Sequence, residues 1–323
     1  MKLPFSTAVY EHAARFVNRS PYEVSRNAEL LFHAHRLAYL EYRHTPIAVG
    51  IDIYNLEAEA YGAKVRVPDD NSIPAISKPL FNSAEEMIKL SPFDPQRDGR
   101  IAMVIWVAQH LKQELPEAVV KIPLAGPFSI AFNLLGIMRL CEEVAEKPQI
   151  VARMLMRLAE NQAVFCKAIV QVGLTPAFFE SAAAPPMLSP KQFHELELPA
   201  LKRIIEIASN YSNQRVPCIM GGNTYPVLDD ILSTGTNYLV CNPETDQAAF
   251  VKKVALVAPD VKVRVNMRSD IVVSKDRDKI YAEVDRIVQL TRGCSNCILG
   301  TGALPYETPI ENVRLIREYV ERD

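Results

Sequence analysis

The sequence predicts a single α/β domain in which parallel β-strands alternate with helices. Three observations support this. The chain has 323 residues, of which 49% are hydrophobic and 23% charged, as in ordinary globular proteins. Its second half alternates short apolar runs with longer amphipathic segments. Finally, the 23 prolines are dispersed and no low-complexity linker divides the chain, so one domain is the better interpretation.

Seven short apolar runs are the expected strands. Because strands buried on both faces are continuously apolar, and helical patterns separate these runs, we expect parallel pairing through crossover helices. A (β/α)8 barrel needs one more strand, either before Pro46 or within Ile101–Gln109. An open doubly wound sheet is the alternative, although no G-x-G-x-x-G follows a strand, which excludes its commonest nucleotide-binding version. The expected strands are Pro46–Ile53, Val119–Ala125, Ala177–Ser181, Val216–Gly221, Tyr238–Cys241, Val261–Val265 and Cys297–Gly300.

The segments between these runs have helical periodicity. Pro148–Val172 carries an apolar stripe and ends at Gly173. Leu188–Ser209 begins with Ser189-Pro190, a cap residue followed by a proline at the first helical position, and Pro199 should break or kink it. Two further helices are expected over 246–257 and 274–291.

Charge and cysteine content exclude several classes of protein. With 36 basic and 38 acidic side chains the net charge is −2, so the basic excess that nucleic-acid binding requires is missing. Six cysteines are too few for a disulfide scaffold. There is no run of about 18 apolar residues and no secretory apolar core near the start. We therefore expect a cytoplasmic protein with reduced thiols, acting on neither nucleic acid nor membrane.

Polar side chains follow most of the expected strands. If the fold is a barrel, these residues meet at the carboxyl ends of the strands, where barrel enzymes carry their chemistry. The set is rich in amides and poor in charge, which suits a small polar or carboxylated ligand held by hydrogen bonds. It comprises Asp52, Tyr54, Asn55, Gly126-Pro127, Glu180-Ser181, Asn223-Thr224, Cys241-Asn242, Asn266-Met267-Arg268 and Thr301.

Three charged residues are the strongest candidates in this set. Glu180 has apolar neighbours, which disfavour its charged form and suit it to proton transfer or metal binding; the alternative is a carboxylate that caps a helix or pairs with an arginine. Asp52 lies in an apolar strand and must be paired or functional. Arg268 could hold a substrate carboxylate, or form a salt bridge at the rim.

The sequence gives little support for a metal centre or for histidine-based catalysis. Cys294-Ser295-Asn296-Cys297 has the spacing of a metal knuckle, but no second pair supplies the remaining ligands, so we interpret it as two ordinary thiols. None of the six histidines belongs to an H-E-x-x-H or comparable arrangement. Metal content is therefore left open.

Several segments resemble the uroporphyrinogen decarboxylase superfamily. These are Gly126-Pro127-Phe128-Ser129, Gly221-Gly222-Asn223-Thr224 and the stretch 298–305 followed by 308–313. Residues 56–63 are more similar to the branch of corrinoid-dependent methyltransferases. The resemblance covers roughly Ile47 to Val320. It implies a (β/α)8 barrel over residues 46–323, preceded by an N-terminal helical extension over residues 1–45, with the cleft at the strand ends.

The chain departs from both known branches. The decarboxylases carry an arginine-rich segment near the start that nothing between Met1 and Tyr42 matches, a tyrosine where this chain has Asn133, and a histidine where it has Thr301. The methyltransferases bind zinc through His-x-Cys and a later Cys. This chain has Ile219-Met220 and Ala303 near those places, so a zinc site is doubtful.

The favoured hypothesis is a methyltransferase of the corrinoid-linked demethylating type, acting on a small methylated substrate. Glu180 would protonate the departing oxygen or nitrogen, or bind a metal, and Asp52 is the second catalytic candidate. The resemblance implies a corrinoid supplied by a partner protein, and a possible homodimer. One alternative is a metal-independent decarboxylase or lyase using Asp52, Glu180 and Arg268; another is a non-catalytic barrel that binds a corrinoid or tetrapyrrole. The expected substrate-binding residues are Tyr54, Asn55, Asn133, Asn223, Asn242, Asn266, Arg268 and Thr301.

Overall fold

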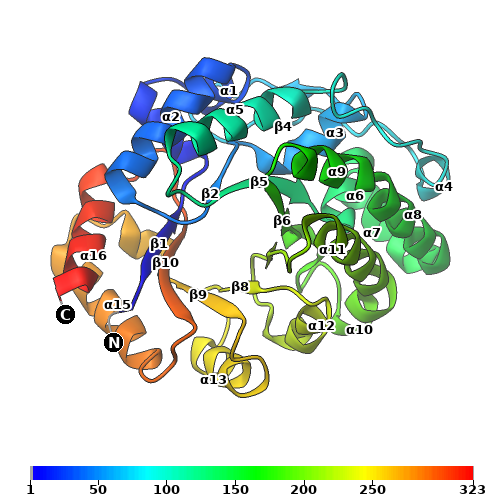
Figure 1. Ribbon diagram of the computed structural model, residues 1–323. Coiled ribbons are helices and arrows are strands. Elements are labelled where there is room, and N and C mark those ends of the chain that lie inside the picture. The colour runs from blue at the N-terminus through cyan, green and yellow to red at the C-terminus, as the bar shows by residue number, and fades with distance from the viewer. Residues whose placement is uncertain (1–2, 323) are drawn as a thin grey trace.

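A computed structural model describes residues 3–322, and Figure 1 shows its strands arranged as a ring surrounded by helices. The strands form two four-stranded parallel sheets. One sheet has the order β1 (Phe5–Ala8), β10 (Cys297–Ala303), β9 (Lys262–Asn266) and β8 (Tyr238–Cys241). The other has the order β2 (Ile47–Ala48), β5 (Val120–Ala125), β6 (Thr175–Phe179) and β7 (Cys218–Ile219).

Side-chain hydrogen bonds connect the two sheets at both seams. Between β1 and β2, the Ser6 hydroxyl donates to the Thr45 carbonyl at 2.7 Å and accepts from the Thr45 amide at 3.0 Å. Between β7 and β8, the Cys218 amide donates to the Thr236 hydroxyl at 2.8 Å. The eight strands therefore follow one another around a closed ring in chain order, and the fold is a (β/α)8 barrel.

All seven expected strands are confirmed. Tyr238–Cys241 has the expected ends, and at least one end of each of the other six is shifted by one or more residues. The eighth strand is β1, which lies before Pro46, whereas Ile101–Gln109 belongs to helix α5 (Ile101–Glu114). This corrects one expectation for residues 1–45. They do supply helices, but Phe5–Ala8 also pairs with β10 inside the barrel, so the first residues are not an extension outside it.

Helices cover the outside of the ring, and a short β3–β4 hairpin (Val65–Arg66 and Ala75–Ile76) follows the second barrel strand. Before this hairpin lie η1 (Glu11–Val17), α1 (Pro21–Ser25), α2 (Ala28–Tyr42), η2 (Ile53–Asn55) and α3 (Leu56–Ala60). After it come α4 (Ala84–Met87), α5, α6 (Pro127–Leu135), α7 (Ile137–Glu146), α8 (Pro148–Asn161), α9 (Ala163–Gln171), η3 (Ser181–Ala183), α10 (Pro190–Gln192), η4 (Phe193–Glu197) and α11 (Leu198–Ser212). The last third contains η5 (Tyr225–Val227), α12 (Leu228–Ser233), α13 (Gln247–Val257), α14 (Ser269–Val272), α15 (Arg277–Leu290) and α16 (Ile310–Arg322).

Two expected helices are interrupted for identifiable reasons. The pattern over 148–172 divides into α8 and α9 at Gln162, whose buried amide group donates to the Ala125 carbonyl and to Glu57 at the inner layer. The kink expected at Pro199 takes the form of a π-helical turn, η4, immediately before α11. Proline supplies no backbone N–H, so the regular i→i−4 bond cannot form there.

Strand β6 shows how the barrel separates its inside from its helix layer. Ala177 and Phe179 are buried against Ala48 and Ile53 inside the ring, whereas Phe178 packs in the larger core between strands and helices. Successive side chains on a strand point to opposite faces. The same alternation therefore determines the directions in which the side chains that follow Phe179 point.

Within residues 3–322, no helix combines the length and the apolar character that crossing a membrane requires.

Candidate functional site

A cavity of about 410 Å³ lies at the carboxyl ends of the strands, and its lining is mainly apolar. A neighbouring cavity of about 370 Å³, with a more polar lining, shares Asn242, Asn266, Gly302 and Ala303 with it. Barrel enzymes place their ligands at this end of the ring. The first cavity is lined by Ala8, Tyr10, Glu11, Ile51, Asp52, Ile53, Tyr54, Asn55, Ile73, Pro74, Ala75, Phe179, Ser181, Ile219, Met220, Gly221, Val240, Asn242, Arg264, Asn266, Gly302 and Ala303.

Arg264 on β9 is the most unusual residue of this lining. It is 5% exposed, its Nε atom is buried without a hydrogen-bond partner, and no carboxylate within residues 3–322 forms an ion pair with it. The phenol groups of Tyr10 and Tyr238 are close enough for the Arg264 charge to act on them. Burial raises the pKa of Tyr10 to about 12, and the arginine charge opposes that shift.

The neighbouring strand leaves room for this arginine. A Cβ atom added at Gly300 on β10 would lie 2.5 Å from both the Arg264 Cγ atom and the Asn266 Oδ1 atom. Only glycine therefore lets the two side chains of β9 cross β10 at this level.

Glu11, the first residue of η1, also lines this cavity. It is 8% exposed, and its Oε2 atom is buried without a hydrogen-bond partner. Burial raises the pKa of Glu11 to about 7, with a smaller contribution from the charge of Glu307. A carboxyl group in this state can carry its proton near neutral pH and donate it to a molecule in the cavity.

Asn266 and Asn242 form an amide pair on the side of the cavity shared with its neighbour. The Asn266 amide group donates to Asn242 Oδ1 at 2.9 Å, and the Asn242 amide group donates to the Met220 carbonyl at 3.1 Å. Asn266 Oδ1 is buried and has no donor within the described chain. It can accept a hydrogen bond from a ligand. Both asparagines line the cavity, and their role in binding a substrate stays a prediction.

Tyr54 and Ser181 are joined across the cavity wall. Their hydroxyl groups are 2.7 Å apart, and Ser181 also accepts from the Gly221 amide at 2.8 Å. Burial raises the pKa of Tyr54, so its phenol is neutral. Asn133 does not line either cavity; it donates to the Tyr54 carbonyl at 2.6 Å and supports the wall from behind.

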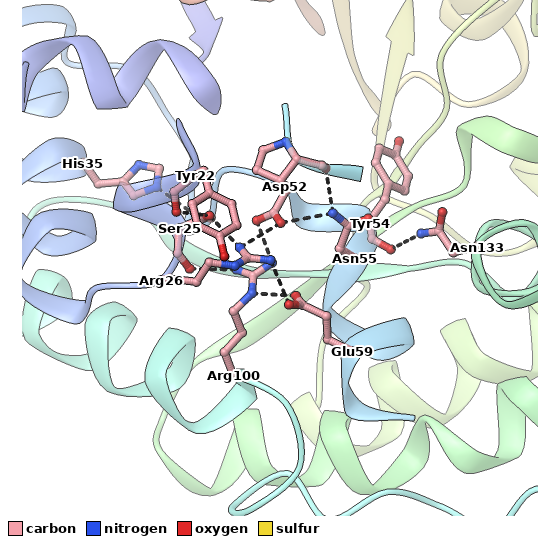
Figure 2. Close-up of polar contacts among 12 residues, drawn as sticks. Tyr22, Ser25, Arg26, His35, Asp52, Tyr54, Asn55, Glu59, Arg100 and Asn133 are labelled. Carbon is pink, nitrogen blue, oxygen red and sulfur yellow. Dashed lines mark hydrogen bonds and ion pairs between the residues drawn. The ribbon is translucent and has the colours of Figure 1, made fainter. Parts of the chain in front are cut away.

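Asp52 lines the cavity, but its carboxylate is fully engaged in the ion-pair network shown in Figure 2. Arg26 and Arg100 lie 3.1 and 2.6 Å from its two oxygens, and the same arginines bind Glu59 at 2.8 and 2.6 Å. Asn55 adds a hydrogen bond of 3.0 Å to Asp52 and one of 2.7 Å to the Pro74 carbonyl. These contacts give Asp52 and Asn55 a structural role in the wall of the cavity.

Glu180 lines neither cavity. It follows Phe179 and points into the helix layer, where it accepts hydrogen bonds from the amides of Phe128 and Ser129 at 3.1 and 3.0 Å and from the Ser129 hydroxyl at 2.6 Å. It thus caps the N-terminus of α6, which is the alternative that the sequence left open. Gly126 is required there because a Cβ atom would collide with this carboxylate. Burial raises the pKa of Glu180, and that of the neighbouring Glu197 as well.

The remaining predicted ligand-binding residues lie at or outside the rim. Arg268 lines the second cavity but is exposed and pairs with Asp270 at 2.9 Å. Thr301 is buried beside the same cavity, with its hydroxyl 2.7 Å from that of Thr7. Asn223 is exposed and accepts from the Tyr225 amide, so it lines neither cavity.

The donor set around the cavity does not fit the zinc site that the resemblance implied. Within residues 3–322, no three His, Cys, Asp or Glu side chains are grouped so that they could hold a metal ion. Cys218 lies next to the segment where the ligands would be, but burial raises the pKa of its thiol and it does not line the cavity. No step of the chemistry below is therefore assigned to zinc.

Sequence reasoning missed Arg264, Glu11 and Tyr10. A signal for Arg264 existed, because it lies two residues before Asn266 on the same strand and therefore shares its face. Nothing in the irregular stretch around Tyr10 and Glu11 indicated a position at the strand ends, because the strand that precedes them was itself not located.

Comparison with protein-family models now gives the fold a family. The model described as uroporphyrinogen decarboxylase (URO-D) matches residues 3–322, nearly the whole chain. The chain belongs to the uroporphyrinogen decarboxylase family. A search of curated protein sequences gives no significant match.

Solved structures agree with this fold. A methyltransferase from Methanosarcina mazei superposes with a TM-score of 0.85 at 18% identity, covering 99% of this chain and 94% of that one. A putative vitamin-B12 independent methionine synthase from Listeria monocytogenes gives a TM-score of 0.54 at 11% identity, with 99% and 97% covered. A β-glycosidase from Thermosphaera aggregans gives 0.51 at 10% identity, with 99% and 97% covered. At these identities the likeness concerns the barrel and not the reaction.

Proposed function

We propose that this member of the family is a methyltransferase that removes a methyl group from the oxygen or nitrogen of a small substrate bound in the 410 Å³ cavity. The observation that carries the proposal is Glu11, a buried carboxyl group with an unpartnered oxygen in that cavity. The Methanosarcina mazei methyltransferase shows that a barrel of this shape can serve a methyltransferase, which is compatible with the proposal.

Demethylation needs a proton at the leaving group. When the bond between the methyl carbon and the oxygen or nitrogen breaks, the bonding pair stays on that atom, which departs poorly as an anion. Burial raises the pKa of Glu11 to about 7, so a large fraction of the molecules carry its proton near neutral pH and can deliver it to the departing atom. In this proposal Glu11 takes the role that the sequence assigned to Glu180.

The methyl group would pass to a corrinoid supplied by a partner protein, which serves as its acceptor. The chain's own contribution is to bind the substrate and to exclude water from it. Apolar side chains such as Phe179, Ile219 and Val240 form most of the lining, and the second, more polar cavity adjoins the first at Asn242 and Asn266. That second cavity widens the opening at which a partner could approach.

The test mixes the purified protein with a reduced corrinoid protein and a panel of methoxylated aromatics and methylated amines, and follows methyl transfer by the absorption of the corrinoid. We expect Glu11→Gln to lower kcat by about 10²-fold or more, as loss of a general acid does. Glu180→Gln should retain the greater part of the rate, because Glu180 does not reach the cavity. Failure of every substrate in the panel would count against the proposal, and loss of rate in Glu180→Gln alone would return the acid role to that residue.

A metal-independent decarboxylase or lyase is the second candidate, and it is favoured because Arg264 and Glu11 both line this one cavity. There the bond to the departing carboxyl carbon breaks, the pair remains on the substrate carbon, and Glu11 supplies the proton. Carbon dioxide release from a small acid without any corrinoid protein would support this candidate over methyl transfer. Tight binding without turnover in either assay would instead indicate a non-catalytic binding barrel.

A further inference from the structure

We infer that Arg264 is the anchor for a carboxylate group, and that the cavity takes small monocarboxylic acids with an apolar body. The inference deepens the proposed function by naming the substrate class, and rests on it only in taking this cavity as the substrate site. Figure 1 places β9 in the ring of strands. Arg264 lies on this strand, and both Arg264 and Asn266, the last residue of the strand, line the cavity.

The first argument is electrostatic. A guanidinium group stays protonated at any pH a protein tolerates, so Arg264 is a buried positive charge. Burial without a counter-charge is unfavourable unless an anion compensates it. Within residues 3–322 no carboxylate lies within 4.0 Å of Arg264, whereas Arg100, whose side chain is 9% exposed, pairs with two. A bound anion would supply what the chain does not.

Tyr10, Tyr238 and His44 lie around Arg264 and strengthen this argument, because none of these three side chains carries a negative charge. The phenols of Tyr10 and Tyr238 are neutral, since burial raises the pKa of each. His44 is also buried, with both ring nitrogens unpartnered; burial, together with the charges of His35 and Arg264, lowers its pKa to about 3, so it is neutral too. These three groups around Arg264 are therefore neutral, and they do not compensate the positive charge of the arginine.

The lining of the cavity defines the rest of the ligand. Apolar side chains form most of the lining, among them Phe179, Ile219 and Val240, and the volume of about 410 Å³ fits a small organic molecule. The lining has few polar groups, as expected where polar contacts orient the ligand and apolar contacts supply most of its affinity. A single carboxylate with an aromatic or aliphatic body matches this lining better than a polycarboxylate, because Arg264 is the only cation that the cavity lining contains among the described residues.

The carboxylate also has a natural geometry at Arg264. The planar fork of N–H donors can bind both oxygens of a carboxylate. Asn266 lies two residues further along β9 on the same face, and its unpartnered Oδ1 can accept a hydrogen bond from a hydroxyl or amine of the ligand. Both side chains depend on the space that Gly300 leaves.

The test measures binding and needs no corrinoid protein. Isothermal titration of the full-length protein uses benzoate, 4-methoxybenzoate, cyclohexanecarboxylate and hexanoate, each compared with its uncharged primary amide. We expect at least one acid to bind with Kd below about 1 mM and its amide to bind at least tenfold more weakly. Arg264→Met should lower the affinity for that acid at least tenfold, and Arg264→Lys should lose less, because a charge without the fork remains.

Controls keep folding apart from recognition. Arg203→Met removes an exposed arginine on α11 that pairs with Glu206 outside the cavity, and should bind the acid as the wild type does. Gly300→Ala should also weaken acid binding, because its methyl group displaces the Arg264 and Asn266 side chains. Thermal unfolding of each variant verifies that it is folded at the titration temperature.

Two results would overturn the inference. One is that no acid of the panel binds the wild-type protein below about 1 mM; the other is that Arg264→Met binds acid and amide as the wild type does. Both results are distinct from failure of methyl transfer. Acid binding that depends on Arg264 but leads to no methyl transfer would sustain the anchor and reject the proposed reaction.

Discussion

Two groups of arginines with limited exposure are connected to the same cavity, one through its lining residue Asp52 and one in the lining itself, and they differ in one respect. Arg26 and Arg100, shown in Figure 2, share Asp52 and Glu59 in a network of four ion pairs, so two positive charges meet two negative ones. Arg264, inside the ring, has no carboxylate partner within residues 3–322. Both are arginines with little exposure, yet only one has its charge compensated by the chain.

This difference gives a way to distinguish buried charges that stabilise the fold from buried charges that bind a ligand. A paired network beneath a cavity holds two segments of chain together: here it connects α1 and α2 at the N-terminal side to the residues after β2 and before α5. An unpaired charge that lines a cavity weakens the fold and persists only where something else uses it. The predictions below test that distinction.

The largest expected effect comes from making the same substitution at both places. Arg100→Met should lower the free energy of unfolding by about 3–5 kcal/mol, because it leaves two largely buried carboxylates with a single cation. Arg264→Met should leave the free energy of unfolding of the ligand-free protein unchanged or raise it by about 1 kcal/mol, because it removes an unpaired buried charge and keeps an apolar side chain of similar length. Urea unfolding at pH 7 measures both.

A loss of stability in Arg264→Met comparable with that in Arg100→Met would contradict the comparison. It would mean that Arg264 has a structural role in the free protein, through the hydroxyl groups of Tyr10 and Tyr238. Arg203→Met, an exposed arginine, serves as the reference for the substitution itself and should change stability little.

The next effect concerns the two kinds of buried carboxyl group. Burial raises the pKa of Glu11 to about 7 from a usual 4.5, so the folded protein favours its protonated form. The associated stability is complete below pH 4.5 and is lost as the pH rises through 7, a difference of about 3 kcal/mol. Glu11→Gln should remove this dependence, so the stability of the variant relative to wild type should increase by about that amount between pH 4.5 and pH 8.

Unfolding by urea at a series of pH values provides the measurement, and the difference between the two proteins isolates Glu11. The comparison of proteins matters because other groups titrate in the same experiment. Glu57, whose pKa burial raises to about 8, acts in the same direction. His12 and His35, whose pKa values burial lowers to about 4, reduce stability as the pH falls below 6.5. Equal pH profiles for wild type and Glu11→Gln would show that Glu11 ionises normally.

The sequence predicts the barrel well because buried parallel strands are continuous apolar runs. Tyr238–Cys241 is predicted to the residue, and Lys262–Asn266 within one residue at each end. The first strand, Phe5–Ala8, contains only four residues with two hydroxyl side chains, so it gives no such run. Its hydroxyl groups are used in the fold, since Ser6 closes the seam with Thr45 and Thr7 bonds Thr301.

The candidate site is harder to predict because it depends on the direction of each side chain. At the end of β6, Phe179 and, two residues later, Ser181 line the cavity, while Glu180 between them points into the helix layer. An error of one residue in strand parity exchanges the two faces. The sequence analysis selected Glu180 because a carboxyl group among apolar residues suits proton transfer. The direction of its side chain, however, follows from the alternation of side chains along the strand. The same alternation identifies Arg264 once Asn266 is placed.

The smallest expected effect distinguishes Arg264 from Arg268, the arginine that the sequence analysis considered either as a carboxylate ligand or as part of a salt bridge at the rim. Arg268 lines the second cavity, but its side chain is 60% exposed and pairs with Asp270, so water and that partner already compensate its charge. Arg268→Ala should therefore change the Kd of the monocarboxylate by less than twofold, against tenfold or more for Arg264→Met. Titrations at 50 and 300 mM salt sharpen the contrast, because screening weakens an exposed charge far more than a buried one. A tenfold loss in Arg268→Ala that disappears at high salt would move the anion site from the inside of the ring to its rim.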